Sequence, residues 1–137
     1  MRILKSQGLL VAAAVMAACS TEPAGSLLRG TWGGQNMRAE FSESGARFEF
    51  TCAAGRVDQP IEAANGEFDV PGNYYFAAGP VGNPPPRPAR FVGTVAGSRL
   101  TVKVILTDQG TAAGEWIGWK GNKGTVLPCP IVAPPNL

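Results

Sequence analysis

The chain has 137 residues, of which 12 are basic and 10 acidic, and it contains no histidine. This length fits one domain, and the near-neutral charge lacks the basic footprint of a nucleic-acid-binding protein, so we expect no nucleic-acid partner. Without histidine, Ser-His-Asp and Cys-His nucleophilic sites are excluded and a zinc site is disfavoured. We therefore expect a protein that is not an enzyme and needs no metal or cofactor.

The N-terminal segment has the layout of a secretory signal. Arg2 and Lys5 precede an uncharged apolar run over residues 8–18, which is too short to span a bilayer as a helix. The run ends in Met16-Ala17-Ala18-Cys19 and resembles the lipobox of bacterial lipoproteins, with Met16 where leucine is usual. The resemblance implies cleavage after residue 18 and a lipid on Cys19. A plain signal peptide or an uncleaved anchor is the alternative.

The lipoprotein reading fixes a location and a domain plan. It implies a bacterial cell envelope protein held at the membrane through its acyl chains, at the outer membrane if the cell has two membranes, because Ser20 rather than aspartate follows the cysteine. The predicted plan is a signal peptide over 1–18, a tether over 19–28, a folded domain over 29–130 and a tail over 131–137. Removing Arg2 and Lys5 with the signal leaves ten basic and ten acidic residues, so the mature chain is formally neutral.

The folded region alternates apolar and polar residues between turn signals such as Ser44-Gly45, Asn65-Gly66 and Gly97-Ser98. A period of two with one apolar face indicates half-buried antiparallel strands, and no apolar stripe of helical period runs long enough to predict a helix. We predict an all-β domain of about eight strands, forming an up-and-down barrel, with a β-sandwich as the alternative. The strands are expected near 30–34, 36–42, 46–52, 60–64, 67–77, 90–96, 99–107 and 114–120, with a short ninth over 125–129.

The start of the domain reads Gly30-Thr31-Trp32. A Gly-x-Trp on the first strand resembles the calycins, the lipocalin and avidin group of eight-stranded barrels. That resemblance implies a tryptophan that closes one barrel end under a basic side chain from the last strand; here the late residues available are Lys120 and Lys123 in place of arginine. The layout also resembles a set of small bacterial lipoproteins with no known activity, through Gly30–Gly34, Cys52–Gly55, the proline-rich stretch 79–90 and Cys129.

Once Cys19 is assigned to lipid, two cysteines remain, Cys52 and Cys129. Export places them in an oxidising compartment, where we expect a disulfide, with two free thiols as the alternative. The bond would tie the end of an early strand to the C-terminal strand of a barrel, or join the two sheets of a sandwich.

Two aromatic clusters are the candidate ligand-binding residues. Tyr74 and Tyr75 lead into a long connection that contains Pro84-Pro85-Pro86-Arg87-Pro88, and Trp116 and Trp119 lie three apart, so that a strand would turn them to opposite faces. The proline-rich connection is either a lid beside an aromatic-lined mouth or a stiffened link.

Two functions remain open. The first is a binding module for a small apolar or envelope-derived ligand, for which an open barrel interior lined by tryptophan or tyrosine would be the sign. The second is a protein-interaction role, such as an inhibitor of an exported enzyme or an envelope-assembly accessory, which a packed interior would favour. Small anchored barrels with one disulfide resemble bacterial lysozyme and metalloprotease inhibitors, although the Tyr-x-x-x-Thr-Lys-Gly element of membrane-bound lysozyme inhibitors is missing.

Overall fold

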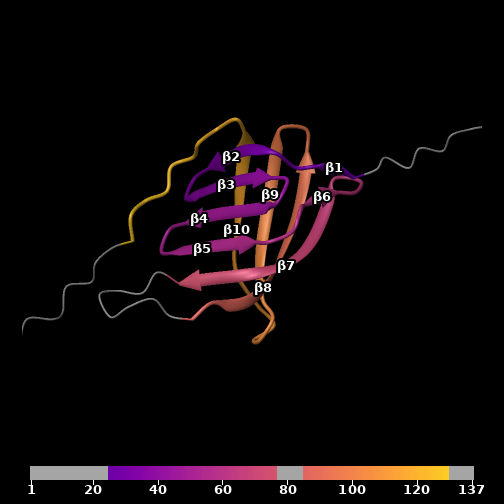
Figure 1. The fold of residues 1–137 in the computed structure, drawn as a ribbon. Coiled ribbons are helices and arrows are strands. Elements are labelled where there is room, and N and C mark those ends of the chain that lie inside the picture. The colour runs from indigo at the N-terminus through magenta and orange to yellow at the C-terminus, as the bar shows by residue number, and fades with distance from the viewer. Residues whose placement is uncertain (1–24, 77–84, 130–137) are drawn as a thin grey trace, which may run out of the picture.

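A computed structural model describes residues 25–76 and 85–129, and within them the chain forms a closed eight-stranded antiparallel barrel. The barrel strands are β2 (Gly30–Gly34), β3 (Met37–Ser42), β4 (Gly45–Phe50), β5 (Ala53–Val57), β7 (Glu67–Phe76), β8 (Arg87–Ala96), β9 (Arg99–Leu106) and β10 (Thr111–Lys120). Each pairs with the next along the chain, and β10 pairs with β2 to close the barrel. The predicted barrel is confirmed, and the sandwich alternative is excluded. Figure 1 shows β2–β5 lying crosswise in front of β9 and β10.

Outside the barrel, β1 (Ser26–Leu27) and β6 (Glu62–Ala63) form a two-stranded ribbon. Leu28 and Ile61 are buried beside this ribbon, and the Leu28 amide donates a hydrogen bond to the Ile61 carbonyl at 2.9 Å. The first described strand therefore starts at Ser26, three residues before the expected boundary at 29. Apolar burial of Leu28 explains the difference, since this residue belongs to the core rather than to a tether.

Two ends of the barrel can be distinguished by their connections. The disulfide end holds the turns at 35–36, 51–52 and 107–110 and the facing ends of β7 and β8, while the β1 end holds the β1–β6 ribbon and the turns at 43–44 and 97–98. Figure 1 shows β1, the first described strand, on one side of the molecule and the last described residues, which follow β10, on the other side. The first and the last described residues therefore lie at different ends of the barrel.

Turn chemistry accounts for most of the connections. Asn65 and Gly66 have φ values of 54° and 76°, the left-handed pair that a tight two-residue hairpin requires. Gly97 and Gly110 also have positive φ, at 61° and 66°. These turns coincide with the predicted ones, because asparagine and glycine adopt this conformation at little steric cost.

Two predicted strands were wrong and one barrel strand was missed. The stretch 60–64 was expected in the barrel, but β6 covers only Glu62–Ala63 and pairs outside it, while the fourth barrel strand is β5 at Ala53–Val57. The alternation of Phe48, Phe50 and Cys52 predicted one strand to residue 52, but Cys52 has φ 62° in a turn. Because cysteine is not a typical turn residue, the alternation of apolar and polar residues gave no sign that the chain reverses direction at Cys52. The expected ninth strand over 125–129 is also wrong, since Thr125 forms only an isolated bridge with Gln35.

The barrel interior is filled by apolar side chains. Phe48 stacks on Phe91 with 4.9 Å between ring centroids, Phe41 meets Phe48 edge-on at 5.7 Å, and Phe50 stacks on Trp116 at 3.9 Å. Among the described residues no polar or charged residue is buried, apart from the hydroxyl-bearing ring of Tyr74. The inward face of every strand thus contributes to a packed aromatic and aliphatic core.

Candidate functional site

The disulfide is the first feature of the candidate site. Cys52 and Cys129 form a disulfide, with 2.06 Å between the sulfur atoms. This is the expected pair, because these two cysteines remained once Cys19 was assigned to lipid. Cys52 lies in the β4–β5 turn and Cys129 in an irregular segment after β10, rather than on the two strands that we predicted to be tied together. The bond therefore attaches the chain that follows the barrel to a turn at its disulfide end.

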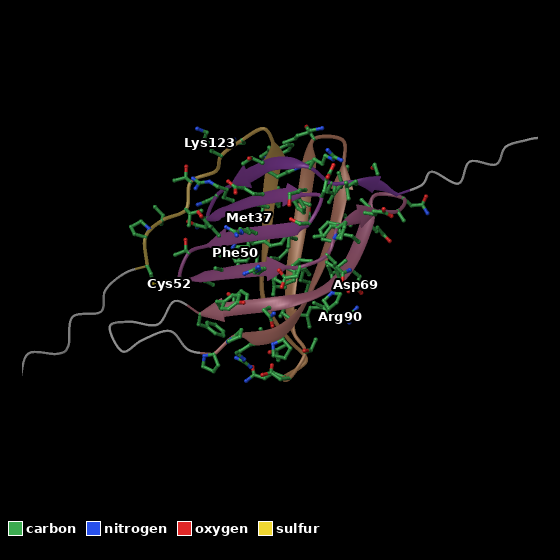
Figure 2. All side chains as sticks on the ribbon, viewed as in Figure 1. Met37, Phe50, Cys52, Asp69, Arg90 and Lys123 are labelled. Carbon is green, nitrogen blue, oxygen red and sulfur yellow. A yellow bond between two sulfur atoms is a disulfide. The ribbon has the colours of Figure 1, made fainter. Side chains whose placement is uncertain are left out.

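The segment from 121 to 129 runs along the outside of β2 and β3 before it reaches Cys52, as Figures 1 and 2 show. Asn36 donates a backbone hydrogen bond to Thr125 at 2.7 Å, and Arg38 Nε donates to the Lys123 carbonyl at 2.6 Å. This close approach requires glycine at position 33, because a Cβ on Gly33 would lie 2.6 Å from the Asn122 carbonyl oxygen. We call this segment the C-terminal strap.

A surface groove of about 530 Å³ lies between the strap and the strands at the disulfide end. Its apolar walls come from Tyr75 and Phe76 at the end of β7 and from Val126 and Leu127 of the strap, and the Arg38–Glu49 ion pair, 3.1 Å long, forms part of the lining. Phe76 and Leu127 are 40% and 54% exposed, high values for large apolar side chains. We call this the strap groove.

The four predicted ligand-binding residues do not gather in one place. Tyr74 and Trp116 turn inward, where Tyr74 is buried in the core and Trp116 is packed against it. Tyr75 lines the strap groove, and Trp119 lies on the outer face of β10, 47% exposed. The expected opposite orientation of the two tryptophans is seen, but the four residues form no single aromatic mouth.

Sequence reasoning missed the strap groove because its walls come from segments that only the disulfide brings together. Leu127 and Val126 fall in a stretch that we assigned to a ninth strand, and Phe76, next to Tyr75, was not among the predicted ligand-binding residues. The usable signal was Cys129 itself, since a bond from there to residue 52 must lay residues 121–128 against the barrel wall. Cys19 and the tail over 131–137 lie outside the described residues, as do residues 77–84 at the start of the proline-rich connection.

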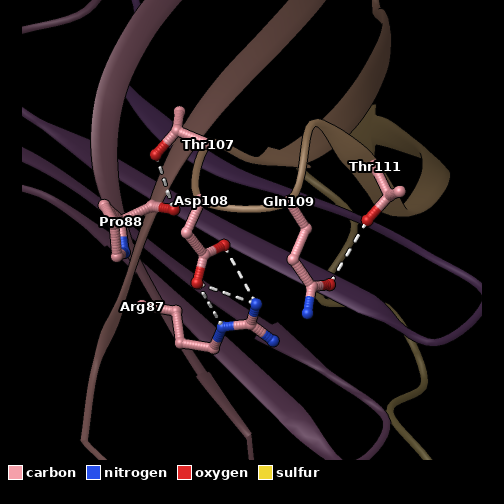
Figure 3. Close-up of polar contacts among 6 residues, drawn as sticks. All are labelled: Arg87, Pro88, Thr107, Asp108, Gln109 and Thr111. Carbon is pink, nitrogen blue, oxygen red and sulfur yellow. Dashed lines mark hydrogen bonds and ion pairs between the residues drawn. The ribbon is translucent and has the colours of Figure 1, made fainter.

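Beside the groove, Figure 3 shows a polar cluster that joins β8 to the β9–β10 turn. Arg87 contacts both carboxylate oxygens of Asp108 at 2.9–3.1 Å, and its guanidinium lies 5.6 Å from the centre of the Phe76 ring. Thr107 donates through both its amide and its hydroxyl to the Pro88 carbonyl. The Arg87 guanidinium, held by Asp108, thus lies against Phe76 at the rim of the groove.

A second pocket, of about 610 Å³, lies on the outer side of β3–β5 toward the β1 end and is strongly polar. Arg47 and Arg56 face each other across β4 and β5 there, with Glu40 opposite Arg47 and Asp58 bonded to Arg56 at 2.7 Å. The charges compensate within the pocket, so it has no excess of one sign with which to attract an ion.

Within residues 25–76 and 85–129, no three metal-ligating side chains lie together, and no helix is long and apolar enough to cross a membrane.

The other barrel end carries the Trp32 arrangement. Trp32 is 3% exposed, its indole Nε1 donates to the Arg29 carbonyl at 3.1 Å, and the Lys120 ammonium lies 5.9 Å from the ring centre. Lysine takes the position in which the calycin resemblance implies arginine.

The fold and these sites define a closed up-and-down β-barrel protein with a packed core and a disulfide-tethered C-terminal strap. Comparisons of the chain with protein-family models, with curated proteins and with solved structures find no match.

Proposed function

We propose that this protein is a non-enzymatic binding module of the bacterial envelope that takes a small apolar ligand in the strap groove. The observation that carries the proposal is the groove itself, in which Phe76 and Leu127 stay exposed at a volume of about 530 Å³. Pockets for small molecules fall in this size range and combine apolar walls with a few polar groups.

The groove is favoured over the barrel interior because the interior has no room and no recognition group. Phe48, Phe91 and Trp116 contact neighbouring rings at 3.9–5.9 Å, so that entry of a ligand would require the core to repack. A buried ligand would also need polar partners to fix its orientation, and the described core offers only the Tyr74 hydroxyl and tryptophan indole N–H groups, of which that of Trp32 already donates to the Arg29 carbonyl.

The groove lining also indicates the ligand's chemistry. Tyr75, Phe76 and Leu127 fit a flat or chain-like apolar body, while Arg38 and Glu49 supply a charge pair at the wall. Arg38 is already held by Glu49 and by the Lys123 carbonyl, so it is positioned before a ligand arrives. An apolar molecule with one hydrogen-bonding group, such as an envelope lipid or its fragment, meets both features.

The proposed location rests on the lipobox resemblance. A diacylglycerol on Cys19 and a further acyl chain on its amine would supply the two chains that stable anchoring requires. The barrel then stands at the membrane surface, at the outer membrane if the cell has two.

A titration with N-phenyl-1-naphthylamine, a neutral apolar probe, tests the groove in the mature chain carrying Cys19→Ser. We expect saturable binding, and binding about tenfold weaker for Phe76→Ser and for Leu127→Ser, because each loses an apolar side chain from the wall. Ile117→Ser is the matched control, since Ile117 is as exposed as Phe76 but lies on the outer face of β10. Absence of saturable binding, or an equal loss in the control, would refute the proposal.

A protein-interaction role is the second candidate, and the packed interior is the observation that favours it. An inhibitor or assembly factor can act through its outer surface without an internal cavity. A partner protein could also insert an apolar side chain into the strap groove. If the apolar probe fails to bind, a photo-reactive residue at position 76 that crosslinks one stoichiometric envelope protein would favour this role. Crosslinking that is unchanged by Leu127→Ser would count against it.

A further inference from the structure

The outer surface of the last two strands carries an apolar and cationic patch. Ile117 and Trp119 are 40% and 47% exposed there, and they account for two of the four large exposed apolar residues that the structure describes. Their cross-strand partners on β9 are Thr101 and Arg99, and the Arg99 guanidinium lies 6.0 Å from the centre of the Trp119 ring. We call Arg99, Thr101, Ile117 and Trp119, with Lys103 next along β9, the Trp119 patch.

Ion pairs hold five of the seven described arginines, and none of these ion pairs lies at this patch. Five ion pairs each use one arginine, at positions 29, 38, 56, 87 and 90, and Arg47 faces Glu40 across β3 and β4. The remaining described cations, none of them in those ion pairs, are Arg99, Lys103, Lys120 and Lys123.

These two strands carry few acidic residues. β9 contains no acidic residue and β10 contains one, Glu115, which lies opposite Lys103. In contrast, the outer face of β3 and β4 alternates Arg38 with Glu40 and Arg47 with Glu49 in matching register. The Trp119 patch is therefore the part of the barrel wall with an excess of positive charge beside exposed aromatic surface.

The N-terminal chain enters the domain at the same end of the barrel. Gly25 lies against Ala64, the Val95 amide donates to the Gly66 carbonyl at 2.6 Å, and Ala96 pairs with Arg99, which pairs with Trp119. This series of neighbours places Gly25 at the same end of the barrel as Trp119. Glu62 and Glu67 lie on the β6 and β7 side of that end, so the cations are concentrated on one side of it.

We propose that the Trp119 patch contacts an anionic lipid surface and orients the barrel on the membrane to which Cys19 anchors it. The proposal rests on the lipid anchor of the proposed function. Seven residue steps from Cys19 to Ser26 reach at most roughly 25 Å, which keeps the β1 end within range of the bilayer. Tryptophan is favoured at the headgroup level, where its ring is half in apolar surroundings, and arginine and lysine are attracted to anionic headgroups.

The test uses the mature lipidated protein, reconstituted into vesicles of phosphatidylcholine with or without phosphatidylglycerol, and a lipid that bears a spin label at its headgroup. Trp32 is buried and Trp116 is packed on the core, so the difference in fluorescence quenching between wild type and Trp119→Phe reports on Trp119. We expect that difference to be large with phosphatidylglycerol and small without it. Removing both cations with Arg99→Gln and Lys103→Gln should weaken the contact by about fivefold per charge or less.

The control variant is Arg56→Gln, which removes an exposed arginine on β5, on the far wall, and should leave the quenching unchanged. Mass spectrometry of Cys19 distinguishes failure of the lipid anchor from failure of the Trp119 patch as a lipid contact. An unmodified Cys19 overturns the anchor and the orientation together, whatever the apolar probe does in the strap groove. A lipidated Cys19 with equal quenching in wild type and Trp119→Phe overturns the patch alone. A concentration-dependent dimer that Trp119→Phe abolishes, without lipid, would overturn the lipid surface in favour of a second copy.

Discussion

The indole ring of Trp116 lies on the phenyl ring of Phe50, with 3.9 Å between centroids and 23° between planes. The contact joins β10 to β4, two strands that are separated in the sheet by β2 and β3. β10 pairs with β2 only through Trp119 and Lys120, whereas it pairs with β9 along almost its whole length. At the disulfide end, the closure of the barrel therefore depends on side-chain packing more than on backbone hydrogen bonds.

Replacing Trp116 should consequently be far more damaging than replacing Trp119. We expect Trp116→Ala to lower the free energy of unfolding by about 3 kcal/mol, because it removes a ring that fills the wall. Trp119→Ala should cost about 1 kcal/mol or less, since the ring lies on the outer face. Urea unfolding followed by circular dichroism measures both. Equal losses for the two variants would mean that the stack does not close the barrel.

The disulfide should contribute mainly by restricting the unfolded chain. It closes a loop with a sequence separation of 77, for which the chain-entropy model gives a stabilisation of about 4–5 kcal/mol. Cys52→Ala, Cys129→Ala and the double variant should therefore lose the same amount, because either change removes the whole bond. Denaturant unfolding under non-reducing conditions measures this, and additive losses in the double variant would contradict it.

Gly55 should be intolerant of even a methyl group. A Cβ at this position would lie 2.6 Å from Cε1 of Phe91 and 3.3 Å from Cβ of Phe48. We expect Gly55→Ala to cost about 1–3 kcal/mol by overpacking. The loss should shrink in the Phe91→Leu background, where the ring is gone, and thermal unfolding of the four members of the cycle measures the coupling. Strict additivity would show that the core relaxes elsewhere.

Alkaline pH should destabilise the barrel through Tyr74. Burial raises the pKa of the Tyr74 hydroxyl above its ordinary value of 10.0. Above about pH 10 the unfolded chain releases this proton and the folded chain keeps it, so the folded state binds more protons and stability falls as pH rises. Tyr74→Phe should remove that part of the slope in unfolding measured from pH 9 to 11, roughly the window of tyrosine titration. Tyr75→Phe, on the neighbouring outward residue, should keep it; if both variants lose the slope equally, burial of Tyr74 is not its cause.

The Arg87–Asp108 pair should depend on the shape of guanidinium and not only on its charge. Two nitrogens of Arg87 contact both oxygens of Asp108, a geometry that lysine cannot reproduce. Arg87→Lys should cost about 1 kcal/mol, and it should also weaken apolar-probe binding in the strap groove because Phe76 loses its support. Arg56→Lys, at the more exposed pair with Asp58, should change neither measurement. An Arg87→Lys variant indistinguishable from wild type would contradict this.

Most of the barrel could be predicted from the sequence because its signals are local. Alternation identified β3, β7 and β9, and glycine, together with asparagine at 65–66, marked the turns at 65–66 and 97–98. The missed strand β5 has small residues, Ala53-Ala54-Gly55, which give no apolar alternation of their own. Their size is required by the core, since the Phe91 ring occupies the space beside Gly55. That requirement is a long-range contact and cannot be read from neighbouring residues.

The candidate site was less predictable for the same reason. Pairing Tyr74 and Tyr75 as neighbours in a cluster ignored that adjacent strand residues face opposite ways, and the structure places one in the core and the other in the groove. Leu127 and Phe76 are 51 positions apart in the sequence and line one wall only because Cys129 is bonded to Cys52. Composition and spacing predicted the disulfide, but they did not predict the path of the C-terminal strap that the disulfide holds.

The chain enters the barrel at β1, while the strap groove lies at the opposite, disulfide end. In a domain tied to lipid through its N-terminus and resting on the Trp119 patch, the groove, which is lined by β3–β5, β7 and the strap, then opens away from the bilayer into the aqueous space. A ligand would be captured from solution or from a carrier, and it would not reach the groove by lateral diffusion within the anchoring leaflet. The protein would accordingly take up molecules that have already left a membrane.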